Sequence, residues 1–140
     1  MTLCDTGPLV ALLDRNDARH EDCRKALPGL TGPLVTTWAC LAEAMHLLGR
    51  AGGHRAQDAL WALVTDGLLL LHEHVPAERG RMRALMARFW DTPMDLGDAS
   101  LVSAAETLGL LRVFTLDSDF LVYRTQAGEA FEPVPAAVSA

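Results

Sequence analysis

The chain has 140 residues, of which 50% are apolar, and its formal net charge is −6. This length suits one compact domain, and so high an apolar content excludes a disordered chain. No apolar run reaches the ~20 residues that a membrane-spanning helix needs, and the N-terminus lacks the basic segment and apolar core of a signal peptide. We therefore expect one domain over residues 1–140, without membrane contact and in the cytoplasm.

The cysteines stand at positions 4, 23 and 40. Their odd number and wide spacing, with no CxxC pair, support neither a disulfide framework nor a structural zinc site. We expect reduced thiols, buried in the core.

Arginines supply all but one of the twelve basic residues. Because the chain is acidic overall, it has no global basic field that attracts nucleic acid. A local basic patch can still bind nucleic acid, and the alternative is that these arginines form a solvated helix face. The patch consists of Arg79, Arg81, Arg83 and Arg88.

Strand-like and helix-like segments alternate along the chain. The pattern predicts a strand over about 1–5 and a helix over about 7–14. Asn16 or Asp17 can cap a second helix that runs to about Leu27. A turn rich in proline and glycine then leads to a short strand at 34–36.

The second half continues the alternation. Thr37 can cap a helix with an apolar stripe, which the glycines 49, 52 and 53 end. Later, Pro76 opens an arginine-rich helix and Asp98 opens another. The segments predicted after the glycines are helix 54–66, strand 68–71, helix 76–90, helix 99–109, strand 112–116 and a short C-terminal edge strand with a tail, 131–140.

This order of segments favours an α/β fold with a mostly parallel sheet, covered on both faces by helices. Ligands gather at the carboxyl ends of the strands in such sheets. Asp5 and Asp117 are predicted at the carboxyl ends of strands, and Asp98 at a helix start beside the same edge. We therefore expect the three carboxylates in one crevice.

Glu43 adds a fourth acid, because it interrupts the apolar face of its predicted helix. Carboxylate oxygens are the ligands that Mg²⁺ and Mn²⁺ prefer. A pair of such ions about 3.5–4 Å apart activates a water and stabilises the leaving oxygen in phosphodiester hydrolysis. The chain shows no Ser/His/Asp or Cys/His set in a useful place, which fits a metal-dependent reaction.

Four segments together resemble a PIN domain, and most closely the VapC toxins of type II toxin–antitoxin pairs. They are Asp5–Leu13, Thr36–Ala44 around Glu43, Asp98–Val102 and Thr115–Phe120. The resemblance implies a three-layer α/β/α fold and a Mg²⁺- or Mn²⁺-dependent endoribonuclease. It also implies a homodimer and a small VapB-like antitoxin whose C-terminal segment lies over the active site.

The resemblance also assigns roles to residues. The acids that it matches to metal binding and catalysis are Asp5, Glu43, Asp98 and Asp117. Thr6 would position Asp5 through its hydroxyl, and Thr115 would support the last acidic loop. Asp119 either assists the metal or caps a turn. The spacing of Asp95 and Asp98 suits a helix cap, so we expect Asp95 to be structural.

Other functions stay open at this stage. The protein can instead be a catalytically weak module that binds RNA or a partner protein, with the acids around a structural ion. A PIN nuclease that acts in RNA maintenance or on DNA flaps is a further alternative. We expect structural or surface roles for the histidines, including His72 and His74, and core packing rather than base stacking for Trp38, Trp61 and Trp90.

Overall fold

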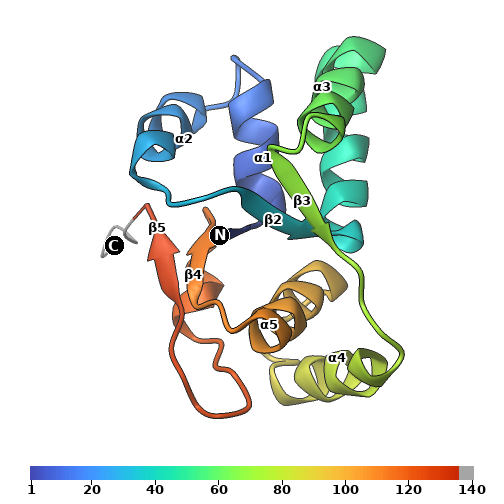
Figure 1. Ribbon diagram of the computed structural model, residues 1–140, viewed down its shortest axis with the longest axis vertical. Helices are drawn as coiled ribbons and strands as arrows, with labels where there is room; N and C mark the ends of the chain where they lie inside the picture. Colours follow the sequence, from blue (N-terminus) through green and yellow to red (C-terminus); the bar gives the residue numbers. More distant parts are fainter. Residues whose placement is uncertain (136–140) are drawn as a thin grey trace.

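The computed structural model describes residues 1–135 and contains a five-stranded sheet between helices (Figure 1). The strands follow the order β3-β2-β1-β4-β5, and each neighbouring pair is parallel. The predicted α/β fold with a mostly parallel sheet is therefore confirmed. The strands are β1 (Thr2–Cys4), β2 (Leu34–Thr37), β3 (Leu69–His72), β4 (Arg112–Phe114) and β5 (Glu132–Val134). Thus β5 lies at one edge of the sheet, and residues 136–140 of the predicted tail lie outside the described part.

The helices cover both faces of the sheet, which gives the three layers (Figure 1). One apolar cluster joins α1 and α3 to the sheet through Leu9, Leu48 and Phe114. A second joins α4 and α5 to the other face through Leu85 and Leu101. The helices are α1 (Thr6–Leu13), α2 (His20–Ala26), α3 (Trp38–Thr65), α4 (Ala77–Arg88) and α5 (Leu96–Leu108), with short 3-10 turns η1 (Leu27–Gly29) and η2 (Ser118–Leu121).

Helix α3 consists of two helical halves joined at Gly53. This glycine has φ 67° and ψ −157°, a conformation that side chains other than glycine rarely adopt. The halves fold back on one another, since Gln57 Nε2 donates to the Met45 carbonyl at 3.2 Å and the rings of Trp38 and Trp61 meet edge to face at 6.5 Å. The predicted glycine break is thus confirmed, at Gly53.

The tryptophan prediction is wrong. Trp38, Trp61 and Trp90 are 45%, 43% and 73% exposed, so none is packed in the core. Trp38 donates its indole N–H to the surface carboxylate of Glu73 at 3.0 Å. An indole that finds its polar partner at the surface keeps part of its ring in water.

Two helix starts also differ from the prediction. Helix α2 begins at His20 after Arg19, whereas Asp17 accepts a hydrogen bond from the Arg19 amide at 2.8 Å and so forms a turn before the helix. Helix α5 begins at Leu96, because Asp95 is its N-cap and Asp98 lies within its first turn. The predicted capping role of Asp95 is confirmed.

The three cysteines are free thiols with no exposed surface, as expected. Within residues 1–135, none of the helices has the length and apolar character that crossing a membrane requires.

Candidate active site

Three of the four predicted acids come together at the carboxyl ends of the central strands. Asp5 directly follows β1, Asp117 follows β4, and Asp98 lies in the first turn of α5. One carboxylate oxygen from each lies within 4.8 Å of the other two. We call this group the carboxylate trio. The trio forms because β1 and β4 are parallel neighbours, so both strands end at the same edge of the sheet.

Asp5 is held on both of its carboxylate oxygens. It is the N-cap of α1, where Oδ1 accepts from the Thr6 amide at 2.8 Å. Oδ2 accepts from the hydroxyl of Thr115 at 2.9 Å, and the same hydroxyl oxygen accepts from the Asp117 amide at 3.0 Å. Thr115 therefore ties the Asp117 loop to Asp5, as its predicted supporting role requires.

The predicted role of the Thr6 hydroxyl is wrong. This hydroxyl donates to the Cys40 carbonyl at 3.3 Å and lies 3.4 Å from Glu43 Oε2. The backbone amide of Thr6 holds Asp5 instead, because an N-cap carboxylate accepts from the amides of the first helical turn.

Asp98 is fixed by a capping box and by a tyrosine. Its amide donates to Asp95 Oδ1 at 2.8 Å, and its Oδ2 accepts from the Asp95 amide at 3.3 Å. The hydroxyl of Tyr123 donates to the same Oδ2 at 2.9 Å. Sequence reasoning missed Tyr123. The sequence feature that could have identified it is that Tyr123 is the single tyrosine of the chain and stands four residues after Asp119.

Two carboxylates of the trio resist ionisation in their surroundings. Burial raises the pKa of Asp5 to about 6, although hydrogen bonds from Thr6 and Thr115 oppose the shift. Burial and the negative charge of Asp95 raise the pKa of Asp98 to about 7, against the hydrogen bond from Tyr123. Carboxylates that resist ionisation in this way are stabilised in the charged form by a nearby cation.

Glu43 lies at the rim of the same hollow and is exposed. An open hollow of about 410 Å³ carries the trio, and Glu43, Leu47 and Asp95 also line it. The structure does not place Glu43 within the 4.8 Å group that Asp5, Asp98 and Asp117 form. Its contact with the site runs through the Thr6 hydroxyl.

Asp119 contributes to a turn. Its amide donates to Asp117 Oδ1 at 2.9 Å, so Asp117 caps the η2 turn that contains Asp119. Burial and the charge of Asp117 raise the pKa of Asp119. The predicted turn cap is therefore Asp117 and not Asp119, which lies within the turn next to the trio.

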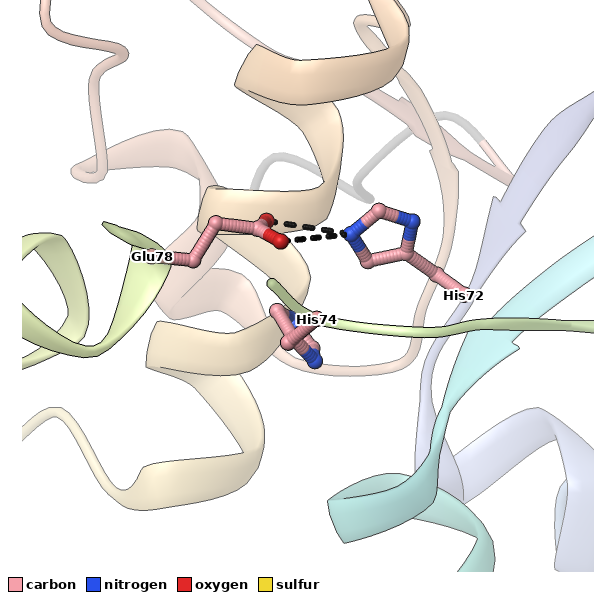
Figure 2. Close-up of side chains that lie close together, drawn as sticks. All are labelled: His72, His74 and Glu78. Carbon is pink, nitrogen blue, oxygen red and sulfur yellow. Dashed lines mark hydrogen bonds and ion pairs between the residues drawn. The ribbon is translucent and has the colours of Figure 1, made fainter. Parts of the chain in front are cut away.

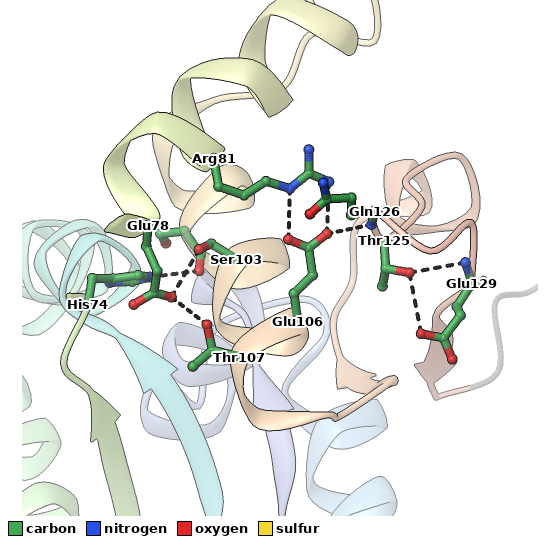
Figure 3. A network of polar contacts seen from close by, with 10 residues as sticks. His74, Glu78, Arg81, Ser103, Glu106, Thr107, Thr125, Gln126 and Glu129 are labelled. Carbon is green, nitrogen blue, oxygen red and sulfur yellow. Dashed lines mark hydrogen bonds and ion pairs between the residues drawn. The ribbon is translucent and has the colours of Figure 1, made fainter. Parts of the chain in front are cut away.

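The arginine patch on α4 is divided. Arg81 forms a bidentate pair with Glu106 of α5, with two contacts of 2.8 Å (Figure 3). The guanidinium of Arg88 lies 4.8 Å from the centre of the Phe89 ring. Arg79 and Arg83 are exposed and line a shallow hollow. The charge of Arg81 is thus neutralised within the fold, which leaves a smaller patch than the sequence predicts.

No protein-family model matches the chain, and no curated protein matches it either. Among solved structures, VapC20 of Mycobacterium tuberculosis, a sarcin-ricin loop cleaving toxin, is similar with a TM-score of 0.79 and 21% identity, over 85% of this chain and 92% of that chain. A chain of a toxin-antitoxin complex from Klebsiella pneumoniae has a TM-score of 0.65 and 21% identity, over 86% of this chain and 90% of its own length. The protein therefore has the three-layer PIN-like fold of the VapC toxins.

Proposed function

We propose that the protein is a Mg²⁺- or Mn²⁺-dependent endoribonuclease and the toxin of a type II toxin–antitoxin pair. The observation that carries this proposal is the carboxylate trio, in which Asp5 and Asp98 are buried carboxylates with raised pKa values. The likeness in fold to a toxin that cleaves the sarcin-ricin loop supports RNA as the substrate class.

The residues present fit a hard divalent cation. Mg²⁺ and Mn²⁺ take carboxylate and water oxygens, and Mg²⁺ keeps several waters while it uses few protein ligands. Three carboxylate oxygens from Asp5, Asp98 and Asp117 lie close enough to share one ion, and the hollow above them is open to water and substrate. These three residues would hold the metal.

When bound, the ion lowers the pKa of an attacking water and offsets charge on the phosphodiester. The chain itself supplies orientation. The Thr115 hydroxyl ties the Asp117 loop to Asp5, while the Asp95 amide and the Tyr123 hydroxyl hold the Asp98 carboxylate. To Glu43 we assign proton transfer or water-mediated metal contact, because it lines the hollow without belonging to the trio.

A binding module is the second candidate. The net charge of −6 and the neutralisation of Arg81 by Glu106 weaken the attraction to a nucleic acid backbone, which favours a partner protein over RNA. In that case the trio would hold a structural ion. A nuclease that acts in RNA maintenance or on DNA flaps would share the trio and differ in its substrate.

We also propose a small VapB-like antitoxin and a second copy of the chain as partners. The similarity to a chain of a toxin-antitoxin complex supports the first. Exposed large apolar residues support both, for example Leu68 at 61% and Leu96 at 55% exposure. Light scattering after gel filtration tests the homodimer, and a strict monomer at high concentration would exclude it. A toxin that acts on cellular RNA would work in the cytoplasm.

The decisive experiment is cleavage of total RNA by the purified, partner-free protein with Mg²⁺ or Mn²⁺. EDTA and the variant Asp98→Asn are the negative controls, and Asp58→Asn, at an exposed position on α3, is the matched control. We expect discrete products that require metal and Asp98 but not Asp58. A folded protein that binds the metal and cleaves neither RNA nor a DNA flap would support the binding module instead.

A further inference from the structure

A second group of metal-ligating side chains lies where β3 leads into α4. His72 ends β3, His74 follows it in the connection, and Glu78 belongs to the first turn of α4 (Figure 2). One donor atom of each residue lies within 4.8 Å of the other two. We propose that these three residues bind Zn²⁺, or another divalent metal that favours imidazole, at a site separate from the carboxylate trio.

The spacing of His72 and Glu78 suits a shared metal. His72 Nε2 lies 3.0 Å from Glu78 Oε1 and 3.2 Å from Oε2 (Figure 2). Zinc bonds of about 2.0–2.2 Å in a tetrahedral site place neighbouring ligand atoms about 3.3–3.5 Å apart. An ion can therefore replace the proton between these groups with a shift of a few tenths of an ångström. The side chains are 9% and 8% exposed, so the ligands are largely shielded from water.

The hydrogen bond of His74 leaves a nitrogen for the metal. Its Nε2 lies 3.0 Å from the Ser100 carbonyl oxygen. A carbonyl can only accept, so Nε2 carries the proton and the lone pair of the neutral ring is on Nδ1. Metal-ligating histidines almost always donate their other ring N–H to a carbonyl or carboxylate in this way.

The carboxylate of Glu78 is held in place by donors from α5 and from the connection that precedes α4. The hydroxyls of Ser103 and Thr107 donate to Oε1 at 3.0 and 2.9 Å (Figure 3). The Val75 amide donates to Oε2 at 2.8 Å. Within residues 1–135, the partners of Oε2 are His72 and the Val75 amide, so this oxygen keeps a lone pair for the metal. An ion pair needs only His72 and Glu78. The structure also places a nitrogen of His74 beside them, which gives the three ligand atoms that a metal site requires.

The donor set separates this site from the trio. Two imidazoles and one carboxylate favour Zn²⁺ or a similar transition metal, while the all-oxygen trio favours Mg²⁺ or Mn²⁺. The two sites are connected through α5. Ser100, which accepts from His74, also contacts the Thr37 hydroxyl at 2.6 Å and donates to the Gly97 carbonyl at 2.7 Å. A metal at His74 would thus steady the helical turn that carries Asp98.

The test is zinc titration calorimetry on the full chain carrying Asp98→Asn, which weakens the trio as a competing site. We expect one Zn²⁺ per chain and at least tenfold weaker binding after the further change His74→Gln, since loss of a ligand costs at least as much as loss of an outer-shell partner. His74→Gln leaves the buried pair of His72 and Glu78 intact. The matched control His54→Gln, at an exposed position on α3, should bind zinc unchanged.

A cobalt spectrum of the unmodified chain provides a measurement that needs no variant. Co²⁺ in a four-coordinate site of nitrogen and oxygen ligands absorbs strongly in the visible range, and we expect this signal to persist in excess Mg²⁺. Equal zinc affinity with and without His74, absence of stoichiometric zinc binding, or displacement of the cobalt signal by Mg²⁺ would each overturn the proposal. None of these outcomes depends on ribonuclease activity.

Discussion

The Tyr123 hydroxyl donates a hydrogen bond of 2.9 Å to Asp98 Oδ2 from a position with no exposed surface. The Tyr123 ring meets the rings of Phe89 and Phe120 edge to face, each at 5.2 Å. Burial and the charge of Asp98 raise the pKa of Tyr123, so the hydroxyl stays protonated as a donor. One side chain therefore joins the apolar core to a predicted metal ligand.

Replacing Tyr123 with Phe should weaken Mn²⁺ binding by about 10–100-fold, the usual cost of losing an outer-shell partner. It should also lower the free energy of unfolding by about 1–3 kcal/mol, because Asp98 loses its buried donor. Calorimetry and chemical denaturation measure the two effects. The stability loss should shrink in the Asp98→Asn background, since the two groups interact directly. An equal loss in both backgrounds would show that the hydroxyl acts on something else.

Thr115 offers a matched pair of variants. Thr115→Val keeps the shape but removes the hydroxyl that donates to Asp5 and accepts from the Asp117 amide. We expect metal affinity and cleavage to fall by about 10–100-fold. Thr115→Ser restores the hydroxyl and should recover most of both. If the serine variant is as impaired as the valine variant, packing of the methyl group decides the effect rather than the bridge.

Metal binding should strengthen as the pH rises. A metal ion competes with protons for Asp5 and Asp98, whose pKa values are raised to about 6 and about 7. We expect Mn²⁺ affinity to increase through pH 6–7 and to level off above about pH 8, with proton release on binding. Calorimetry in buffers of different ionisation enthalpy counts the released protons. Affinity that is constant from pH 5.5 to 8 would contradict the raised pKa values.

Asp98→Asn should abolish cleavage and yet stabilise the metal-free protein near pH 8. The folded-state pKa of Asp98 is raised, so its protonated form contributes stability that is full below the unfolded pKa and is lost as the pH rises through about 7. Asparagine stays neutral and avoids this loss. We therefore expect the gain in melting temperature to grow from pH 5 to pH 8. A variant that melts well below the parent at pH 8 would indicate a structural carboxylate.

Two helical glycines test the hollow directly. A Cβ at Gly97 would lie 3.3 Å from Asp95 Oδ1 and 3.8 Å from Glu43 Oε2, inside the hollow, whereas a Cβ at Gly80 would meet nothing within 4 Å. Alanine is better than glycine in a helix by up to about 1 kcal/mol. We expect Gly80→Ala to raise the melting temperature and keep full cleavage, while Gly97→Ala reduces cleavage. Equal cleavage by both variants would place the reaction away from this hollow.

Much of the fold was predictable because its signals are local. Alternating apolar segments predicted the parallel sheet, and Thr37 was correctly predicted as the cap of α3. The start of α5 was missed, because both Asp95 and Asp98 are capable caps and the capping box uses them together. The tryptophans were misplaced, because the sequence around a large apolar ring does not fix whether the ring packs inward. Trp90, for example, lies exposed beyond the end of α4.

The sequence by itself determined that acids follow the strands and open the helices, because capping and strand ends are set by near neighbours. Only the tertiary structure decided which acids meet. Thr115 reaches Asp5 across 110 positions because β4 lies beside β1, and Tyr123 reaches Asp98 of α5 across 25. It also decided that Glu43 stays at the rim and that Asp5 and Asp98 resist ionisation. Burial arises from the packing of the whole chain, so no local pattern reports it.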